Sequence, residues 1–179
     1  MTGPMGMAPA PSSLVDRAGR PNRQCPPVLP RYDGTMTPGQ KLRLAANLLN
    51  LSTPLGLLLA VTTRTRLERG PQGLILGTGY KPRLPVAGAF TVGNVVIYRA
   101  GRAYIDARPA LLGHEARHST QYAFCLGLPF LPLYGLCALW SLSRAGDPGS
   151  HNPFERLAGL EAGGYAKPYA TQRVSEVPQ

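Results

Sequence analysis

The stretch His114-Glu115-Ala116-Arg117-His118 has the form H-E-x-x-H and holds two of the only three histidines among the 179 residues. On an α-helix, residues four apart lie on the same face, one turn apart. The two imidazoles can therefore share one Zn²⁺ ion, and Glu115 between them can hold an attacking water. We expect this helix, at about residues 109–126, to carry a metal site around which the fold is built.

A third metal ligand must come from elsewhere, because a catalytic zinc site has three protein ligands and one open position. Glu155 is the best candidate, since Asn152 suits the N-cap of a second helix and Pro153 suits its first turn. The helix dipole also favours a carboxylate there. We expect this helix at residues 153–163. His151 is the alternative ligand, because it would pair with Glu155 at i,i+4 if the helix began earlier.

The charge at Arg117 argues against ordinary peptidase chemistry. Peptidase helices of this type usually carry uncharged residues at both x positions, and Ala116 complies whereas Arg117 does not. Neighbouring side chains diverge by about 100° on a helix, so the cation can point away from a metal. The charge weighs more against catalysis than against metal binding. The alternative is a helix with two surface histidines and a solvated glutamate.

The motif lies within a longer pattern. Residues 113–122 read G-H-E-A-R-H-S-T-Q-Y, residues 127–134 read G-L-P-F-L-P-L-Y, residues 152–155 read N-P-F-E, and residues 91–96 read T-V-G-N-V-V. Over residues 45–165 this resembles small, largely uncharacterised bacterial proteins with H-E-x-x-H-x-x-Q-Y and N-P-F-E motifs, which look like gluzincin-type zinc metallopeptidases. The resemblance implies a zinc site with His114, His118 and Glu155 as ligands and Glu115 as base. It implies no substrate.

The charge of the chain indicates an anionic neighbour. Nineteen basic residues stand against nine acidic ones, giving a net charge of +10. There is no paired C-x-x-C, no aromatic-studded RNP-like strand and no basic zipper, and aromatic residues make up only 7%. We therefore expect an anionic membrane surface as partner. A basic nucleic-acid-binding module is a weaker alternative.

Two apolar segments are long enough to cross a bilayer, and the first covers residues 42–61. Its only charge is Arg43, but Asn47 and Asn50 weaken a membrane span and Pro54 would kink it. The alternative is a buried helix-turn-helix in which Ser52 or Thr53 caps a second helix. The sequence supports both readings equally.

The second apolar segment, residues 122–143, is interrupted by glycines and prolines. A bent, membrane-dipping hairpin or a buried core segment therefore fits better than a straight span. Trp140 and Tyr134 could lie at the membrane interface, with Arg144 at the headgroups. In a soluble protein, Trp140 would instead lie in the core. We favour membrane contact.

The predicted fold class is α+β, with a mainly helical metal-site core and a small antiparallel β-meander. The meander is expected from short apolar runs at residues 73–80, 87–100 and 102–107, with a hairpin turn at Gly93-Asn94. A proline-rich disordered tail is predicted for residues 1–38 and a polar tail for residues 169–179. Between them, residues 39–168 form a single zincin-like domain.

The expected location is the cytoplasmic face of a membrane, with the cytoplasm as the alternative. No apolar core of a signal peptide is visible in the first thirty residues. Three cysteines form no recognisable disulfide framework, which favours a reducing compartment.

The functional hypothesis is a membrane-associated zinc-dependent hydrolase that acts on a peptide or protein. Zinc would lower the pKa of water, Glu115 would accept its proton, and Tyr165 or Tyr122 could stabilise the oxyanion. The alternative is a non-catalytic, membrane-associated zinc-binding protein in which zinc joins two helices. The fourth coordination position distinguishes them, because it is open in an enzyme and closed in a structural site.

Overall fold

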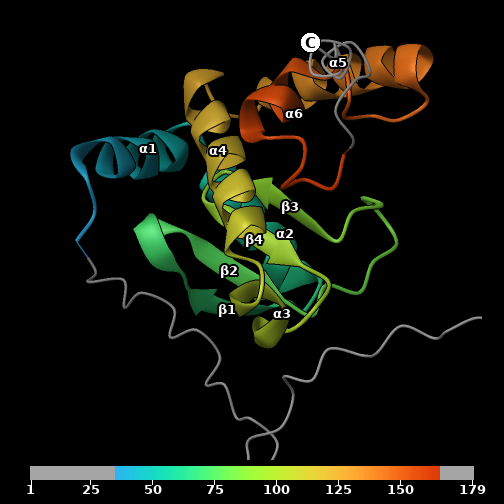
Figure 1. Ribbon diagram of the computed structural model, residues 1–179. Coiled ribbons are helices and arrows are strands. Elements are labelled where there is room, and N and C mark those ends of the chain that lie inside the picture. Colours follow the sequence, from blue (N-terminus) through green and yellow to red (C-terminus); the bar gives the residue numbers. More distant parts are fainter. Residues whose placement is uncertain (1–34, 166–179) are drawn as a thin grey trace, which may run out of the picture. The chain divides into compact units, whose positions relative to one another are not determined.

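A four-stranded sheet packed between helices forms the centre of the computed structural model, which describes residues 35–165 (Figure 1). The strands are β1 (Arg66–Arg69), β2 (Ile75–Thr78), β3 (Ala89–Val92) and β4 (Val95–Tyr98). Together with the helices they confirm the α+β class. The predicted disordered tail lies outside the described residues except for residues 35–38, and the polar tail at 169–179 lies outside them entirely.

The sheet is mixed, so the predicted antiparallel meander is wrong. Its order is β1-β2-β4-β3, and β2 and β4 are parallel, with Ile75 opposite Val95. The predicted hairpin turn is present, because Gly93 and Asn94 connect antiparallel β3 and β4, and Gly93 has a φ of +62°. Residues 79–88 make no tight turn after β2. They lead instead to the far side of β4, which leaves β3 as an edge strand beside the next helices.

Two further elements differ from the expectation. Residues 102–107 were expected as a strand, but Arg102–Asp106 form helix α3, in which the Arg102 guanidinium lies 2.9 Å from the Asp106 carboxylate at i,i+4. Strand β1 lies in a basic segment where no strand was expected. Its pairing with β2, and not a local apolar pattern, stabilises it.

Residues 38–62 form two helices, α1 (Pro38–Leu49) and α2 (Ser52–Thr62), with a bend of 71° between them. The pair is not buried as the helix-turn-helix alternative expected, because Leu49, Leu58 and Val61 are 84%, 60% and 66% exposed. Neither predicted cap is correct, since α2 begins at Ser52 after Leu51, which has a left-handed φ of 66°. Among residues 35–165, no single helix has the length and apolar character needed to cross a membrane; only α1 and α2 taken together have them.

Helices cover both faces of the sheet because successive residues of β4 face opposite sides. On one face, Val95 and Ile97 pack near Leu57 and Leu59 of α2. On the other face, Val96 and Tyr98 join a cluster that includes Ile105 of α3 and Ala116 of the next helix. That helix is α4 (Pro109–Phe124), close to the predicted 109–126, and Figure 1 shows it crossing the sheet.

Two helices follow α4. The apolar segment at 122–143 is broken before α5 (Phe130–Ala145), where Leu126 and Gly127 both have positive φ. Trp140 on α5 is half-exposed and is therefore not a core residue. Helix α6 (Pro153–Ala158) begins as predicted but ends earlier than residue 163, because Gly159, with a φ of +97°, terminates it.

Candidate metal centre

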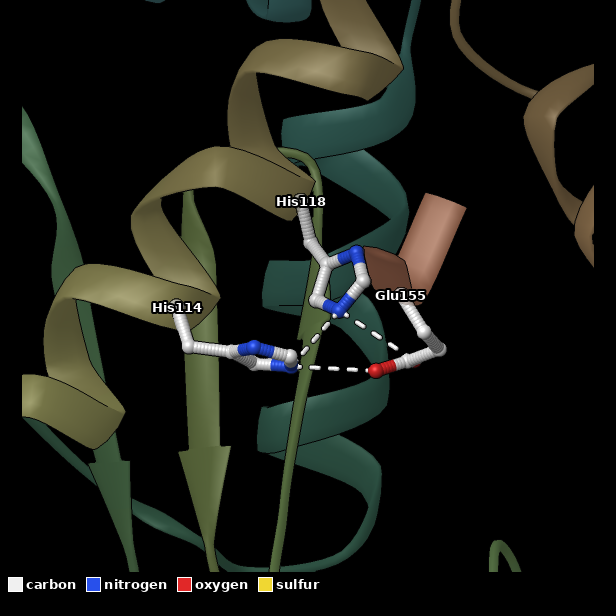
Figure 2. A group of neighbouring side chains, drawn as sticks. All are labelled: His114, His118 and Glu155. Carbon is white, nitrogen blue, oxygen red and sulfur yellow. Dashed lines mark hydrogen bonds and ion pairs between the residues drawn. The ribbon is translucent and has the colours of Figure 1, made fainter. Parts of the chain in front are cut away.

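Three predicted ligands converge in one buried group. His114 and His118 project from α4 toward Glu155 of α6, as Figure 2 shows. The two Nε2 atoms lie 3.0 Å apart, and each lies 3.3 Å from an oxygen of Glu155. The three side chains could hold a metal ion.

The local sequence explains how α6 delivers its carboxylate. The Asn152 side chain accepts a hydrogen bond from the backbone N–H of Phe154, at 3.0 Å, and Pro153 occupies the first turn. Glu155 follows in that same turn, where the helix dipole favours its charge. These caps are the ones predicted from the sequence.

Hydrogen bonds at the far side of each imidazole fix which nitrogen faces the centre. Nδ1 of His114 donates to the carbonyl of Gly159 at 3.0 Å, and Nδ1 of His118 donates to Oε1 of Gln121 at 2.8 Å. The Gln121 amide is itself oriented, because its Nε2 donates to the carbonyl of Phe154 at 2.9 Å. Both Nδ1 partners are acceptors, so each Nδ1 carries the proton. In the neutral rings, both Nε2 lone pairs then point into the group.

A cation fits this arrangement of acceptors. Two lone pairs face each other at 3.0 Å, and the buried Oε2 of Glu155 has no hydrogen-bond partner among the described residues. Bonds of 2.0–2.2 Å in a tetrahedral site place the ligand atoms about 3.3–3.6 Å apart, slightly farther than the 3.0 and 3.3 Å found here. The two Nε2 atoms and Oε2 of Glu155 have no donor between them, and buried acceptors left in this way are costly unless a positive charge satisfies them.

Protons compete for the same place. Burial lowers the pKa of His118, but the hydrogen bond and charge of Glu155 raise it more, so the net shift is upward. Burial raises the pKa of Glu155, but His114 and His118, which donate through Nε2 when their rings are protonated, and the hydroxyl of Tyr134 hold it well below its usual range. Metal binding to such a group displaces protons and weakens as the pH falls.

Glu115 lies beside the group without belonging to it. Its side chain is buried, and Oε2 accepts a hydrogen bond of 2.7 Å from the hydroxyl of Thr91 on β3. Burial raises the pKa of Glu115, and the Thr91 hydrogen bond and the nearby histidines offset only part of this rise. A carboxylate with a raised pKa suits proton transfer near neutral pH.

The group lies in the wall of a cavity of about 1100 Å³, which Glu115 also lines. Both proposed oxyanion partners, Tyr122 and Tyr165, line this cavity. Tyr134 of α5, which the sequence suggested for a membrane interface, also lines the cavity and donates a hydrogen bond of 2.5 Å to Oε1 of Glu155. The sequence signal that could have placed Tyr134 inward is its spacing of four residues from Phe130, which puts both aromatic rings on one face of the helix.

The structure keeps His151 and Arg117 out of this group. His151 packs its ring edge-to-face against Trp140, with centroids 5.9 Å apart, and does not join the three ligands. Arg117 is exposed and donates a hydrogen bond of 2.5 Å to the carbonyl of Ala158, at the end of α6. The guanidinium therefore caps the end of α6 and is not part of the candidate ligand group.

Comparison with known proteins found no match to a family, to a curated protein or to a solved structure. The class of site therefore rests on its own chemistry: a buried group of two histidines and one glutamate, on two helices of an α+β fold, that could hold a metal ion.

Proposed function

We propose that this protein is a zinc-dependent hydrolase with a gluzincin-type site and a peptide or protein substrate. The observation that supports it most strongly is the convergence of three acceptor atoms on the wall of a large cavity, with a buried fourth residue, Glu115, alongside. His114, His118 and Glu155 are the proposed ligands. Two nitrogens and one carboxylate form a donor set that zinc prefers in catalytic sites.

Bound zinc supplies Lewis-acid chemistry, which makes water more acidic and polarises a carbonyl group. Glu115 then acts as the general base. Thr91 donates to Oε2 of the carboxylate, and the other oxygen serves as the proton acceptor. Arg117 has no part in this step, because its guanidinium is engaged with the carbonyl of Ala158 in α6.

The competing function is a metal that only joins α4 to α6. Existing hydrogen bonds weigh against it, because Gln121 and Arg117 of α4 already bind the carbonyls of Phe154 and Ala158 in α6. The adjoining cavity also leaves room for a ligand that is not protein.

Metal analysis of the full-length protein tests the site. We expect about one zinc per chain in the wild type and almost none in His118→Ala or Glu155→Gln. His151→Ala is the matched control and should keep its zinc, because His151 lies against Trp140. Circular dichroism checks that each variant is folded. Near-zero zinc in the wild type would refute the proposal, and four protein ligands in a metal-bound structure would favour the joining role.

A further inference from the structure

The outward face of α5 is apolar where a helix facing water should be polar. The helix has 16 residues, of which only Phe130 and Ser141 are buried. Its outward side chains are 44–66% exposed, and they are Leu131, Leu133, Leu136, Leu139, Trp140 and Leu142. Polar outward residues occur only at the end of the helix, with Ser143 and Arg144.

This face is too wide for a single docked partner helix. Leu131 and Leu133 alone differ by about 200° around the axis, and the other outward residues lie between these directions or close to them. An amphipathic helix buries an apolar stripe of about 100° and keeps the rest polar, whereas a helix that is apolar nearly all round belongs in an apolar environment. The pattern therefore fits an apolar phase that surrounds half of α5.

A second apolar feature adjoins the start of α5. Leu51, between α1 and α2, and Leu126, before α5, both have left-handed backbones and are 60% and 77% exposed. The two corners touch, since a Cβ on Gly127 would lie 2.5 Å from Cγ of Asn50. Left-handed leucines are uncommon, and such a backbone persists where the surrounding structure holds it. Here it presents two apolar side chains to the surroundings.

The segments that form this surface carry charges of one sign. Residues 35–67 and 116–146, which contain both corners and α5, include lysine and arginine but no aspartate or glutamate. The whole chain has a net charge of +10. Anionic lipid headgroups attract such segments, and their acyl chains supply the apolar phase that α5 lacks.

We propose that the outward face of α5, together with the leucine corners at residues 51 and 126, inserts into one leaflet of an anionic phospholipid bilayer. A helix of 16 residues is about 24 Å long, shorter than the hydrocarbon core of about 30 Å. The helix therefore lies along the interface, with Trp140 and Arg144 near the headgroups. Leu131 also borders the metal-site cavity, so docking brings the cavity wall to the leaflet.

Vesicle binding of the full-length protein tests this docking, independently of any metal or hydrolase activity. The vesicles contain equal parts of phosphatidylcholine and phosphatidylglycerol. We expect the wild type to float with them, and less with pure phosphatidylcholine or at high salt. The double variant Leu136→Glu/Leu139→Glu should partition at least about tenfold less, because two apolar contacts are lost. Ala103→Glu is the control and should float like the wild type, since it adds a negative charge on exposed α3.

The fluorescence of Trp140 gives a second readout on the unmodified protein, because the chain has a single tryptophan. Its emission should shift to shorter wavelength when anionic vesicles are added. An unchanged emission, or equal flotation of the double variant and the control, would overturn the proposal. So would a lipid-free dimer that the double variant converts to a monomer, because a second copy of the chain would then cover this face.

Discussion

Helices α4 and α5 follow one another in the chain and have 16 residues each. The two helices differ from an ordinary surface helix in opposite ways, because one buries polar side chains and the other exposes apolar ones. Helix α4 buries mostly polar side chains, namely His114, Glu115, His118, Ser119 and Tyr122 besides Ala116. Helix α5 exposes five leucines and a tryptophan. A surface helix normally shows the reverse pattern, with apolar residues inward and polar residues outward.

The difference identifies two kinds of partner. Buried polar groups are costly unless they are paired, and those of α4 are largely paired with one another or with neighbouring strands and loops. The acceptor atoms of His114, His118 and Glu155 remain without a donor between them, and a cation would satisfy them. The exposed apolar groups on α5 would instead be stabilised by contact with an apolar phase. Substitutions in α4 should therefore impair metal binding, turnover or stability, whereas substitutions on the outward face of α5 should impair lipid binding.

The largest effect is expected at Glu115. Glu115→Gln keeps an oxygen for the Thr91 hydroxyl but removes the base, so turnover of casein or a peptide should fall about 10²–10⁴-fold. Zinc content should not change. Glu68→Gln on β1 is the control and should leave turnover unaltered. Loss of zinc in Glu115→Gln would show that Glu115 is a ligand and not the base.

The next largest effect is expected in the polar network beneath α4, where it concerns stability. Oδ1 of Asn94 accepts hydrogen bonds from Ser119 at 2.8 Å and Asn47 at 3.1 Å, and its Nδ2 donates to Thr53 at 3.0 Å. Asn94→Ala leaves several buried groups unpaired and should lower the free energy of unfolding by roughly 2–4 kcal/mol. Urea denaturation measures this. A loss below about 1 kcal/mol would mean that the network does not hold α4 in place.

A smaller effect, confined to zinc affinity, is expected when Gln121 is substituted. Its side chain orients His118 and links α4 to α6 through Phe154. Gln121→Ala should weaken zinc affinity by about 10–100-fold, as is typical for groups that orient a ligand, with α4 still folded. Competition with a chelating dye measures the affinity. Thr120→Ala, whose hydroxyl bonds only within α4, is the control.

The candidate ligand group could be predicted from the sequence because its information is local. The i,i+4 spacing of two histidines and the capping residues before Glu155 each fix a side chain within one helix turn. The roles of Tyr134 and Thr91 could not be predicted, since they depend on α5 and β3 meeting α4 and α6 across long stretches of chain. Gln121 lay in the predicted motif, but its hydrogen bond to α6 required the packed structure.

The fold was predictable to a similar depth. The Gly93-Asn94 turn, the start of α4 and the break before α5 follow from short-range signals. The parallel pairing of β2 with β4 does not, because it depends on where residues 79–88 lead. Arg99 holds that connection by donating to the carbonyls of Pro82, Arg83, Pro85 and Ala87. No local pattern around Arg99 predicts these bonds.

The same substitution on the two helices should sharpen the contrast between them. Leu139→Gln on α5 should change the free energy of unfolding of the lipid-free protein by no more than about 0.5 kcal/mol, because Leu139 is exposed. Leu112 on α4 packs against the core cluster, so Leu112→Gln should lower the free energy of unfolding by about 1.5–3 kcal/mol. Urea denaturation of both variants measures the difference. Equal losses would mean that the outward face of α5 is covered within the protein.

The smallest effect is expected just after α5, at Asp147. Hydrogen bonds from the Ser150 side chain and backbone, with a further one from the backbone of Gly149, lower the pKa of this exposed carboxylate. A lowered folded-state pKa contributes stability that is present above the unfolded value of about 3.9 and is lost as the pH falls through the folded value.

Asp147→Asn should therefore be slightly less stable than the wild type at neutral pH, by less than about 0.5 kcal/mol because the group is exposed. The two proteins should converge below the folded pKa of Asp147. A carbon-detected NMR titration of Asp147 with a midpoint at or above about 3.9 would remove the basis for this difference. The small size of the effect separates this exposed, solvent-screened charge after α5 from the buried charges that α4 places around the candidate metal site.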